Sequence, residues 1–148
     1  MDLNAARQAL EHSIRFVANT GLKVVELRRG YVKCRMPFAG NENHIGTMYA
    51  GALFTLAELP GGALFLSSFD VGRYFPIVKS LDLQFLKPAS SDVTVEITLD
   101  EARIVALAAE AEVRGKVEFI LEAELKSSDG DVVARSRGVY QLRSAQRT

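Results

Sequence analysis

Cysteine and histidine are scarce in this sequence, which has one cysteine, Cys34, and two histidines among its 148 residues. A single cysteine cannot form an internal disulfide, and so few thiols and imidazoles leave no cluster with the usual spacing of metal ligands. We therefore expect a cytoplasmic protein that needs no metal or redox cofactor. Cys34 itself is expected to be a buried strand residue rather than a nucleophile.

A net charge is also lacking, because eighteen basic residues are balanced by eighteen acidic ones. Without an overall field, the protein has no general attraction for nucleic acid or for an anionic membrane surface. Residues 1–21, MDLNAARQALEHSIRFVANTG, carry an acid at position 2 and scattered charges, unlike a signal peptide or a membrane span. The longest weakly polar run, 45–57, is too short to cross a bilayer. We expect neither nucleic acid nor a membrane as a partner.

What the sequence does contain is enough apolar material for one core. Hydrophobic residues make up 48% of the chain, and a length of 148 residues is typical of a single domain. There is no internal repeat, low-complexity tract or linker-like stretch. We therefore expect residues 1–148 to form one domain.

The N-terminal part of the chain has the pattern of a helix followed by strands. Apolar residues recur at intervals of three and four between residues 2 and 18, which predicts an amphipathic helix that the Asn-Thr-Gly at 19–21 should end. Residues 22–37 mix apolar and charged side chains in alternation, interrupted at Gly30, and this predicts two strands or one bent hairpin. The apolar stripe of the helix comprises Leu3, Ala6, Leu10, Ile14 and Val17.

A second, far more apolar helix is expected after the polar loop 40–46, with Thr47 as its N-cap. It has no polar face for about three turns, so other parts of the protein should surround it. Pro60 and the two glycines after it should bend this helix, which then continues through the apolar residues that follow.

Alternating apolar residues predict four more strands, at 77–85, 93–99, 117–125 and after the turn at Asp129 and Gly130. A short helix at 101–112, capped by Asp100, should lie between the second and third of these strands. Strands with one polar and one apolar face indicate an antiparallel sheet packed on the central helix, which is an α+β fold. In the first of these strands the inward side chains should be Ile77, Leu81, Leu83 and Phe85.

Glu58 is the first charged residue of the central helix. Burial among Leu56, Ala57 and Leu59 would raise the pKa of its carboxyl and suit it to act as a general base or nucleophile near neutral pH. The alternative is that Glu58 only marks the place where the helix reaches solvent.

The first turn of the same helix offers backbone donors. The N–H groups of Ala50 and Gly51 should lack intrahelical acceptors at the positive end of the helix dipole, so they could stabilise an oxyanion. Gly51 could equally reflect close packing of the helix on the sheet. Glu58 lies seven residues beyond Gly51, about 10 Å along the axis, which is too far for both to act on one carbonyl within one chain. If both take part, we expect a homodimer with the site at its interface.

Two polar residues precede this helix in its entry loop. Asn43 could hold a carbonyl or a water by hydrogen bonds, or it could be a turn residue. His44 could be a general base, or it could be an exposed side chain without a role. The sequence leaves both choices open.

These residues resemble the hotdog-fold superfamily, and most closely the phenylacetate-degradation type of acyl-CoA thioesterase. In that type a loop asparagine precedes a His-Gly-Gly at the helix start, and the apolar residues that follow end in Leu-Ala-Asp. Here Asn43 matches the asparagine, Tyr-Ala-Gly at 49–51 replaces His-Gly-Gly, and Phe-Thr-Leu-Ala-Glu at 54–58 matches the end. The segments LQFLKPA at 83–89 and SDGDVVARSRGVYQL at 128–142 also look like the corresponding strands of the family.

The resemblance covers about residues 20–143 and implies an antiparallel sheet wrapped around a long central helix. An N-terminal helix and a short extra helix before the last hairpin are added to that fold here. It also implies that Glu58 activates water or attacks the thioester carbonyl, that the N–H groups of Ala50 and Gly51 hold the oxyanion, and that Asn43 of the partner subunit orients water or substrate. This chain departs from the family at three positions, with Tyr49 in place of histidine, Ala50 in place of glycine and Glu58 in place of aspartate.

The resemblance therefore predicts an acyl-CoA thioesterase that forms a homodimer or a dimer of dimers and needs no cofactor. Coenzyme A should lie in a groove at the dimer interface, where cations either meet its phosphates or are ordinary surface charges. The residues expected to line the substrate site are His44, Tyr49, Thr55, Arg73 and Lys79, with Lys87 and Arg137 as further candidate cations.

Two other functions stay open. Hotdog dehydratases that act on 3-hydroxyacyl thioesters use a histidine and a glutamate fourteen positions apart, the interval between His44 and Glu58 here. This chain lacks that branch's Phe-Pro-Gly and Pro-Gly sequences, which favours the thioesterase. A non-catalytic acyl-CoA-binding or purely structural hotdog dimer is the third candidate, and it is favoured if Tyr49 fills the pocket.

Overall fold

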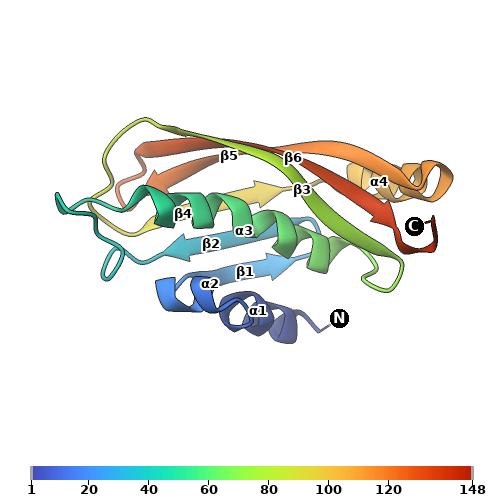
Figure 1. The fold of residues 1–148 in the computed structure, drawn as a ribbon, viewed down its shortest axis with the longest axis horizontal. Coiled ribbons are helices and arrows are strands. Elements are labelled where there is room, and N and C mark those ends of the chain that lie inside the picture. Colours follow the sequence, from blue (N-terminus) through green and yellow to red (C-terminus); the bar gives the residue numbers. More distant parts are fainter. Residues whose placement is uncertain (1, 148) are drawn as a thin grey trace.

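The computed structural model describes residues 2–147, in which a six-stranded sheet packs on one long helix (Figure 1). Two short helices precede the sheet, another lies between its fourth and fifth strands, and a 3₁₀ turn follows the last strand. In chain order the elements are α1 (Leu3–His12), α2 (Arg15–Thr20), β1 (Lys23–Arg28), β2 (Tyr31–Met36), α3 (Ala50–Ser68), β3 (Tyr74–Phe85), β4 (Val93–Thr98), α4 (Glu101–Arg114), β5 (Lys116–Ser127), β6 (Val132–Ser144) and η1 (Ala145–Arg147).

The strands lie in the order β1-β2-β4-β5-β6-β3, and every neighbouring pair is antiparallel. This confirms the antiparallel α+β fold, and α3 packs on the face around which the sheet curves, as expected of a hotdog fold (Figure 1). β1 and β3 form the two edges of the sheet. The edges matter for function because an edge strand can still pair with another chain.

α3 is the centre of the core. Its side chains are almost all apolar, so the helix is stable only where the sheet covers most of its circumference. By length and composition alone α3 could cross a membrane, but most of its residues are buried inside the protein. The expectation that protein surrounds this helix is confirmed.

The start of the expected central helix needs correction, whereas its continuation beyond Pro60 is confirmed. Tyr49, not Thr47, is the N-cap, and its side chain makes no capping hydrogen bond. The Thr47 hydroxyl instead accepts a hydrogen bond from the side chain of Asn43 at 2.9 Å. α3 then runs without interruption through Pro60 to Ser68. A proline inside a helix costs about 3 kcal/mol, and burial of the surrounding apolar residues offsets that cost here.

The single helix expected over residues 2–18 is also wrong, because the chain forms α1 and α2 instead. Ser13 caps the C-terminus of α1 by donating its N–H to the Ala9 carbonyl at 2.9 Å, and Ile14 is extended. Ile14 is 51% exposed and Leu3 is 36% exposed, so neither belongs to the buried stripe. The other buried positions of the stripe are confirmed at Ala6, Leu10 and Val17.

α1 also covers the edge of the sheet at β1. A bulge between Val24 and Glu26 interrupts the pairing of β1 with β2. At this bulge the Val24 N–H donates to Glu11 at 2.8 Å and the Val24 carbonyl accepts from Arg7 at 3.0 Å. Side chains of α1 thus satisfy backbone groups of an edge strand, which leaves the long strand β3 as the open edge.

Several local predictions are confirmed. Gly30 joins β1 to β2 and Gly130 lies in the turn between β5 and β6, both with positive φ that glycine adopts without strain. Asp100 caps α4 by accepting from the Arg103 N–H. Cys34 is fully buried on β2, and burial raises the pKa of its thiol to about 12. The prediction for β3 is partly wrong, because Phe85 is 56% exposed at the end of an edge strand that has a neighbour on one side only.

Candidate functional site

One stripe of α3 is left open by the sheet. Residues at intervals of four along the helix, which lie on one face, are exposed or only half-buried, while the residues between them are mostly buried. Phe54, for example, is 44% exposed within a helix whose neighbouring turns are in the core. The stripe runs through Ala50, Phe54, Glu58, Gly62 and Leu66.

Glu58 lies in the middle of this stripe and is half-buried. Burial raises the pKa of its carboxyl above the usual range, with no charged neighbour contributing to the shift. Among residues 2–147, no hydrogen bond or ion pair to the Glu58 side chain is found. A carboxylate that is desolvated, unpaired and still accessible is suited to accept a proton.

The start of α3 presents two backbone donors. The N–H groups of Ala52 and Leu53 bond to the Tyr49 carbonyl at 3.0 and 3.2 Å, but within the described part of the chain those of Ala50 and Gly51 have no acceptor. The ring of Tyr49 folds over Gly51, since a Cβ built on that glycine would lie 2.5 Å from Tyr49 Cε2. The missing side chain at Gly51 therefore makes room for this ring beside the two free donors.

Glu58 and the two donors stay apart in one chain. α3 has no break between Ala50 and Glu58, so their separation follows helix geometry and is about 12 Å along the axis. One thioester carbonyl cannot contact both at the same time. The inference that a complete site takes its carboxylate and its donors from two chains stays a prediction.

The Asn43 side chain is used inside its own loop. Its carbonyl oxygen accepts from the N–H groups of Ile45 and Thr47, both at 3.0 Å, and its amide donates to the Thr47 hydroxyl. In the free chain Asn43 is thus a turn residue of the kind that asparagine favours. Its proposed contact with water or substrate in a partner subunit stays a prediction.

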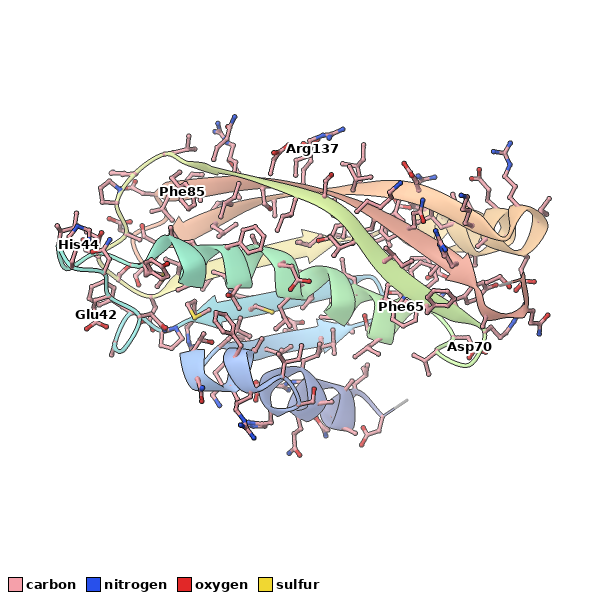
Figure 2. The ribbon with its side chains drawn as sticks, viewed as in Figure 1. Glu42, His44, Phe65, Asp70, Phe85 and Arg137 are labelled. Atoms are coloured by element: carbon pink, nitrogen blue, oxygen red, sulfur yellow. The ribbon has the colours of Figure 1, made fainter. Side chains whose placement is uncertain are left out.

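His44 lies exposed at the tip of the same loop, next to Glu42 (Figure 2). The loop extends away from α3 beyond its first turn, whereas Glu58 lies two turns inside the helix. Within one chain, therefore, the structure does not bring the histidine and the glutamate of the dehydratase alternative together.

The other expected substrate-binding residues do not form one cluster. The Thr55 hydroxyl donates to the Gly51 carbonyl at 2.8 Å, within α3 itself. Arg73 follows α3 at the end marked by Asp70 in Figure 2, opposite the loop that holds His44. All four candidate cations form ion pairs on the surface: Arg73 with Glu112, Lys79 with Glu118, Lys87 with Asp131, and Arg137 with Glu122.

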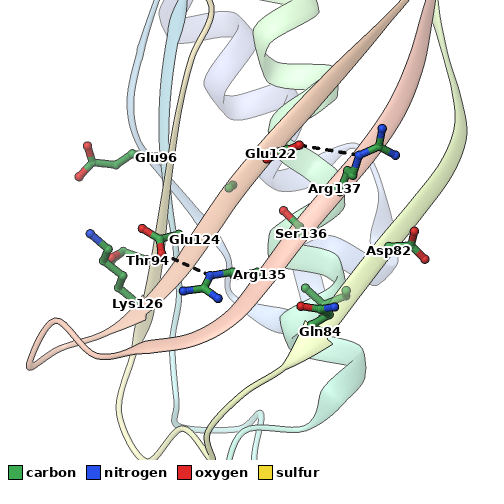
Figure 3. A pocket seen from close by; sticks show the side chains of 12 residues that line it. Asp82, Gln84, Thr94, Glu96, Glu122, Glu124, Lys126, Arg135, Ser136 and Arg137 are labelled. Carbon is green, nitrogen blue, oxygen red and sulfur yellow. Dashed lines mark ion pairs between the residues drawn. The ribbon is translucent and has the colours of Figure 1, made fainter.

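A broad groove of about 930 Å³ lies on the outer face of the sheet, away from α3 (Figure 3). Its charged side chains come from outward positions of β3, β4, β5 and β6, and four of them form the pairs Arg135–Glu124 and Arg137–Glu122. Because acids and bases neutralise each other there, the groove has no strong preference for an anionic group. Glu58 does not line it.

No metal centre is found in the part of the chain that the structure describes, where no three His, Cys, Asp or Glu side chains gather in a suitable group.

One neighbour of Glu58 was not expected from the sequence. Tyr140 of β6 is buried against α3 beside Gly61, and this burial, together with the charge of Glu58, raises the pKa of its hydroxyl to about 12. The alternation of β6 places Gly138, Tyr140 and Leu142 inward. In the sequence, a single inward tyrosine cannot be distinguished from an ordinary core residue.

Comparison with known proteins adds the following. The family described as "Domain of unknown function (DUF4442)" matches residues 4–141. A Pseudomonas aeruginosa protein of unknown function, described as a probable thioesterase, is 56% identical, with a TM-score of 0.95 over 97% of each chain. A Haemophilus influenzae thioesterase has a TM-score of 0.75 at 15% identity over 97% of this chain and 92% of its own, a likeness that shows the fold alone. No curated protein matches the chain.

Proposed function

The chain belongs to the DUF4442 family and has the hotdog fold of thioesterase-like proteins, and from this premise we propose that it is a thioesterase acting through Glu58. The observation that carries the proposal is the half-buried, unpaired carboxylate in the middle of the one open stripe of α3. The similar Pseudomonas aeruginosa protein, itself described as a probable thioesterase, supports the same reaction class.

In the proposed reaction Glu58 acts as a general base. The carboxylate takes a proton from a water molecule while the water oxygen attacks the thioester carbonyl carbon. The carbonyl oxygen becomes an oxyanion, which the N–H groups of Ala50 and Gly51 stabilise. When the intermediate collapses, the carbon–sulfur bond breaks and the thiolate leaves, taking up the proton that Glu58 has held. The products are a carboxylic acid and a free thiol.

The proposed site is shared between two chains. Glu58 and the donors are too far apart in one chain, whereas two copies with facing open stripes could bring the carboxylate of one to the donors of the other. The open edge at β3 supports such pairing. Exposed apolar side chains lie along β3 and just after it, at Val78, Phe85 and Leu86, and an uncovered edge of this kind promotes association between chains.

The proposed substrate is an acyl-coenzyme A, and the proposed place of action is the cytoplasm. Arg73 and Lys79 would meet phosphates of the coenzyme by exchanging their present surface ion pairs for phosphate contacts. Such an exchange costs little, because exposed ion pairs contribute at most about 1 kcal/mol. A cation is therefore not excluded from phosphate binding by its present carboxylate partner.

Non-catalytic binding of an acyl-CoA is the second candidate, and the position of Tyr49 favours it. The ring lies over Gly51 beside the free N–H groups, where it can limit the approach of a carbonyl. In that case the protein would bind acyl-CoA without releasing thiol.

Thiol release from a panel of aliphatic and aromatic acyl-CoAs tests the proposal. We expect hydrolysis by the wild type and a loss of at least about 100-fold in kcat/KM in Glu58→Gln, the size of a missing general base. Glu110→Gln is the matched control, because Glu110 pairs with Arg114 on the surface of α4 and should leave the rate within about twofold. Equal rates in the wild type and Glu58→Gln would remove Glu58 from the mechanism, and binding without thiol release would favour the second candidate.

A further inference from the structure

Tyr140 occupies a slot that two glycines provide. A Cβ built on Gly61 of α3 would lie 2.4 Å from the tyrosine ring and 2.8 Å from its hydroxyl, and one built on Gly138 of β6 would lie 2.5 Å from the ring. Phe119 of β5 stacks on the same ring, with centroids 5.7 Å apart and an angle of 24° between the planes. The ring is thus fixed from the helix, from its own strand and from the neighbouring strand.

The hydroxyl at the end of this ring has no protein partner. Tyr140 is only 5% exposed, and no hydrogen bond to its hydroxyl is found among the described residues. No fully buried polar side-chain atom in residues 2–147 lacks a partner, so this hydroxyl must keep some contact with solvent. The slot therefore aims a polar group from the core into accessible space.

That space adjoins Glu58. Gly61 lies three residues after Glu58 on α3, so the two share one face of the helix, and the Tyr140 hydroxyl contacts that face at Gly61. The carboxylate of Glu58 likewise has no partner within the described residues. Two unpaired polar groups thus lie near each other, close enough for the charge of Glu58 to act on Tyr140. In a partly buried site each would gain from a shared hydrogen-bonding partner.

We propose that Tyr140 is a second catalytic residue of the Glu58 site, where its hydroxyl and the Glu58 carboxylate together hold the attacking water. This inference rests on the proposed thioesterase function. The hydroxyl donates to one lone pair of the water oxygen, and the water donates one proton to the carboxylate. The other lone pair is then directed at the thioester carbonyl carbon. Tyr140 stays protonated throughout, because the pKa of its hydroxyl is about 12.

Few other ionisable groups lie close enough to Glu58 to change the pKa of its carboxyl in place of Tyr140. Of the inward side chains of β2, Cys34 is the one that titrates, and it is fully buried with its pKa raised to about 12. On α1 the charged side chains Arg7 and Glu11 are bonded to backbone groups of β1. The residues paired with Tyr140 on β5 and β3 are Phe119 and Val78, which do not titrate.

Tyr140→Phe tests the inference, because it removes the hydroxyl and keeps the stacked ring. Carboxyl-carbon NMR titration of the labelled full-length protein should show a higher pKa of Glu58 in Tyr140→Phe than in the wild type. The reason is that the variant loses the hydroxyl that stabilises the ionised carboxylate through the shared water. The kcat for thiol release should fall by about tenfold with KM unchanged. Tyr74→Phe is the control, since the Tyr74 hydroxyl donates to Glu112 at 2.7 Å instead.

An unchanged pKa of Glu58 in Tyr140→Phe would overturn the inference, as would an unchanged kcat in an active enzyme. An equal shift in Tyr74→Phe would also overturn it, because the effect would then be a general loss of stability. If the wild type hydrolyses no acyl-CoA, the proposed function fails. The titration still decides, without any turnover, whether the tyrosine and the glutamate are coupled.

Discussion

At the scale of single residues, the proposed chemistry depends on the surroundings of one carboxylate, that of Glu58. The sequence alone made Glu58 a candidate, because a charged residue stands out within an otherwise apolar helix. It could not identify Tyr140, because an inward tyrosine in a strand has the same pattern whether its hydroxyl is useful or not. The distinguishing signal is the pair Gly61 and Gly138, which come together only in the folded chain.

The raised pKa of Glu58 predicts a pH-dependent effect on stability. A carboxyl whose pKa is higher in the folded state contributes stability when it is protonated, and that contribution is lost as the pH rises through the folded-state value. Glu58→Gln cannot ionise, so it should gain stability relative to the wild type between pH 4 and pH 8. We expect a gain of about 1–2 °C in Tm at pH 8 and none at pH 4, since Glu58 remains partly solvated. If instead the Tm of Glu58→Gln rose relative to that of the wild type as the pH was lowered, the result would contradict the burial of this carboxyl. Thermal unfolding of both proteins across this range provides the measurement.

At the scale of elements, α3 has some features that the sequence predicted and others that it could not predict. Its lack of a polar face predicted a buried central helix, and the alternation of the later strands predicted the sheet around it. The continuation of the helix beyond Pro60 was predicted, because the residues after the two glycines are again apolar. The open stripe was not predicted, because it is defined by where the sheet ends.

Two adjacent glycines of α3 should respond oppositely to the same substitution. Gly61→Ala places a methyl group against the ring of Tyr140 and should lower the free energy of unfolding by about 1–3 kcal/mol. Gly62 has no atom within 4 Å of an added Cβ, so Gly62→Ala should raise it by about 0.5–1 kcal/mol through helix propensity. Urea unfolding of the two variants measures this contrast. If both variants are stabilised, the tyrosine does not occupy its slot.

At the scale of the whole molecule, the fold and the proposed activity meet at the open side of the sheet. α1 covers the β1 edge, whereas β3 keeps a free edge with exposed apolar residues beside the open stripe of α3. The sequence predicted a site shared between chains from one observation, the distance between Gly51 and Glu58 along the central helix. It could not show that the residues expected to bind coenzyme A lie toward both ends of α3, because that depends on how the chain turns after Ser68.

The donor half of the site can be removed separately from the carboxylate half. Ala50 is the first residue of α3, a position where proline fits a helix and removes only an N–H that is already free. Tyr49 before it has φ −62° and ψ 139°, a conformation that proline permits in its preceding residue. Ala50→Pro should therefore fold, and it should lose about 10²–10³ in kcat as an oxyanion donor is lost.

Mixing the two inactive variants is the most direct test of the site shared between chains. In a mixed dimer of Ala50→Pro and Glu58→Gln, one site carries both changes and the other carries neither. Exchange of subunits at equal concentrations should therefore restore thiol release to about a quarter of the wild-type rate. A mixture as inactive as its two components, or a protein that light scattering shows to be a monomer, would contradict the shared site.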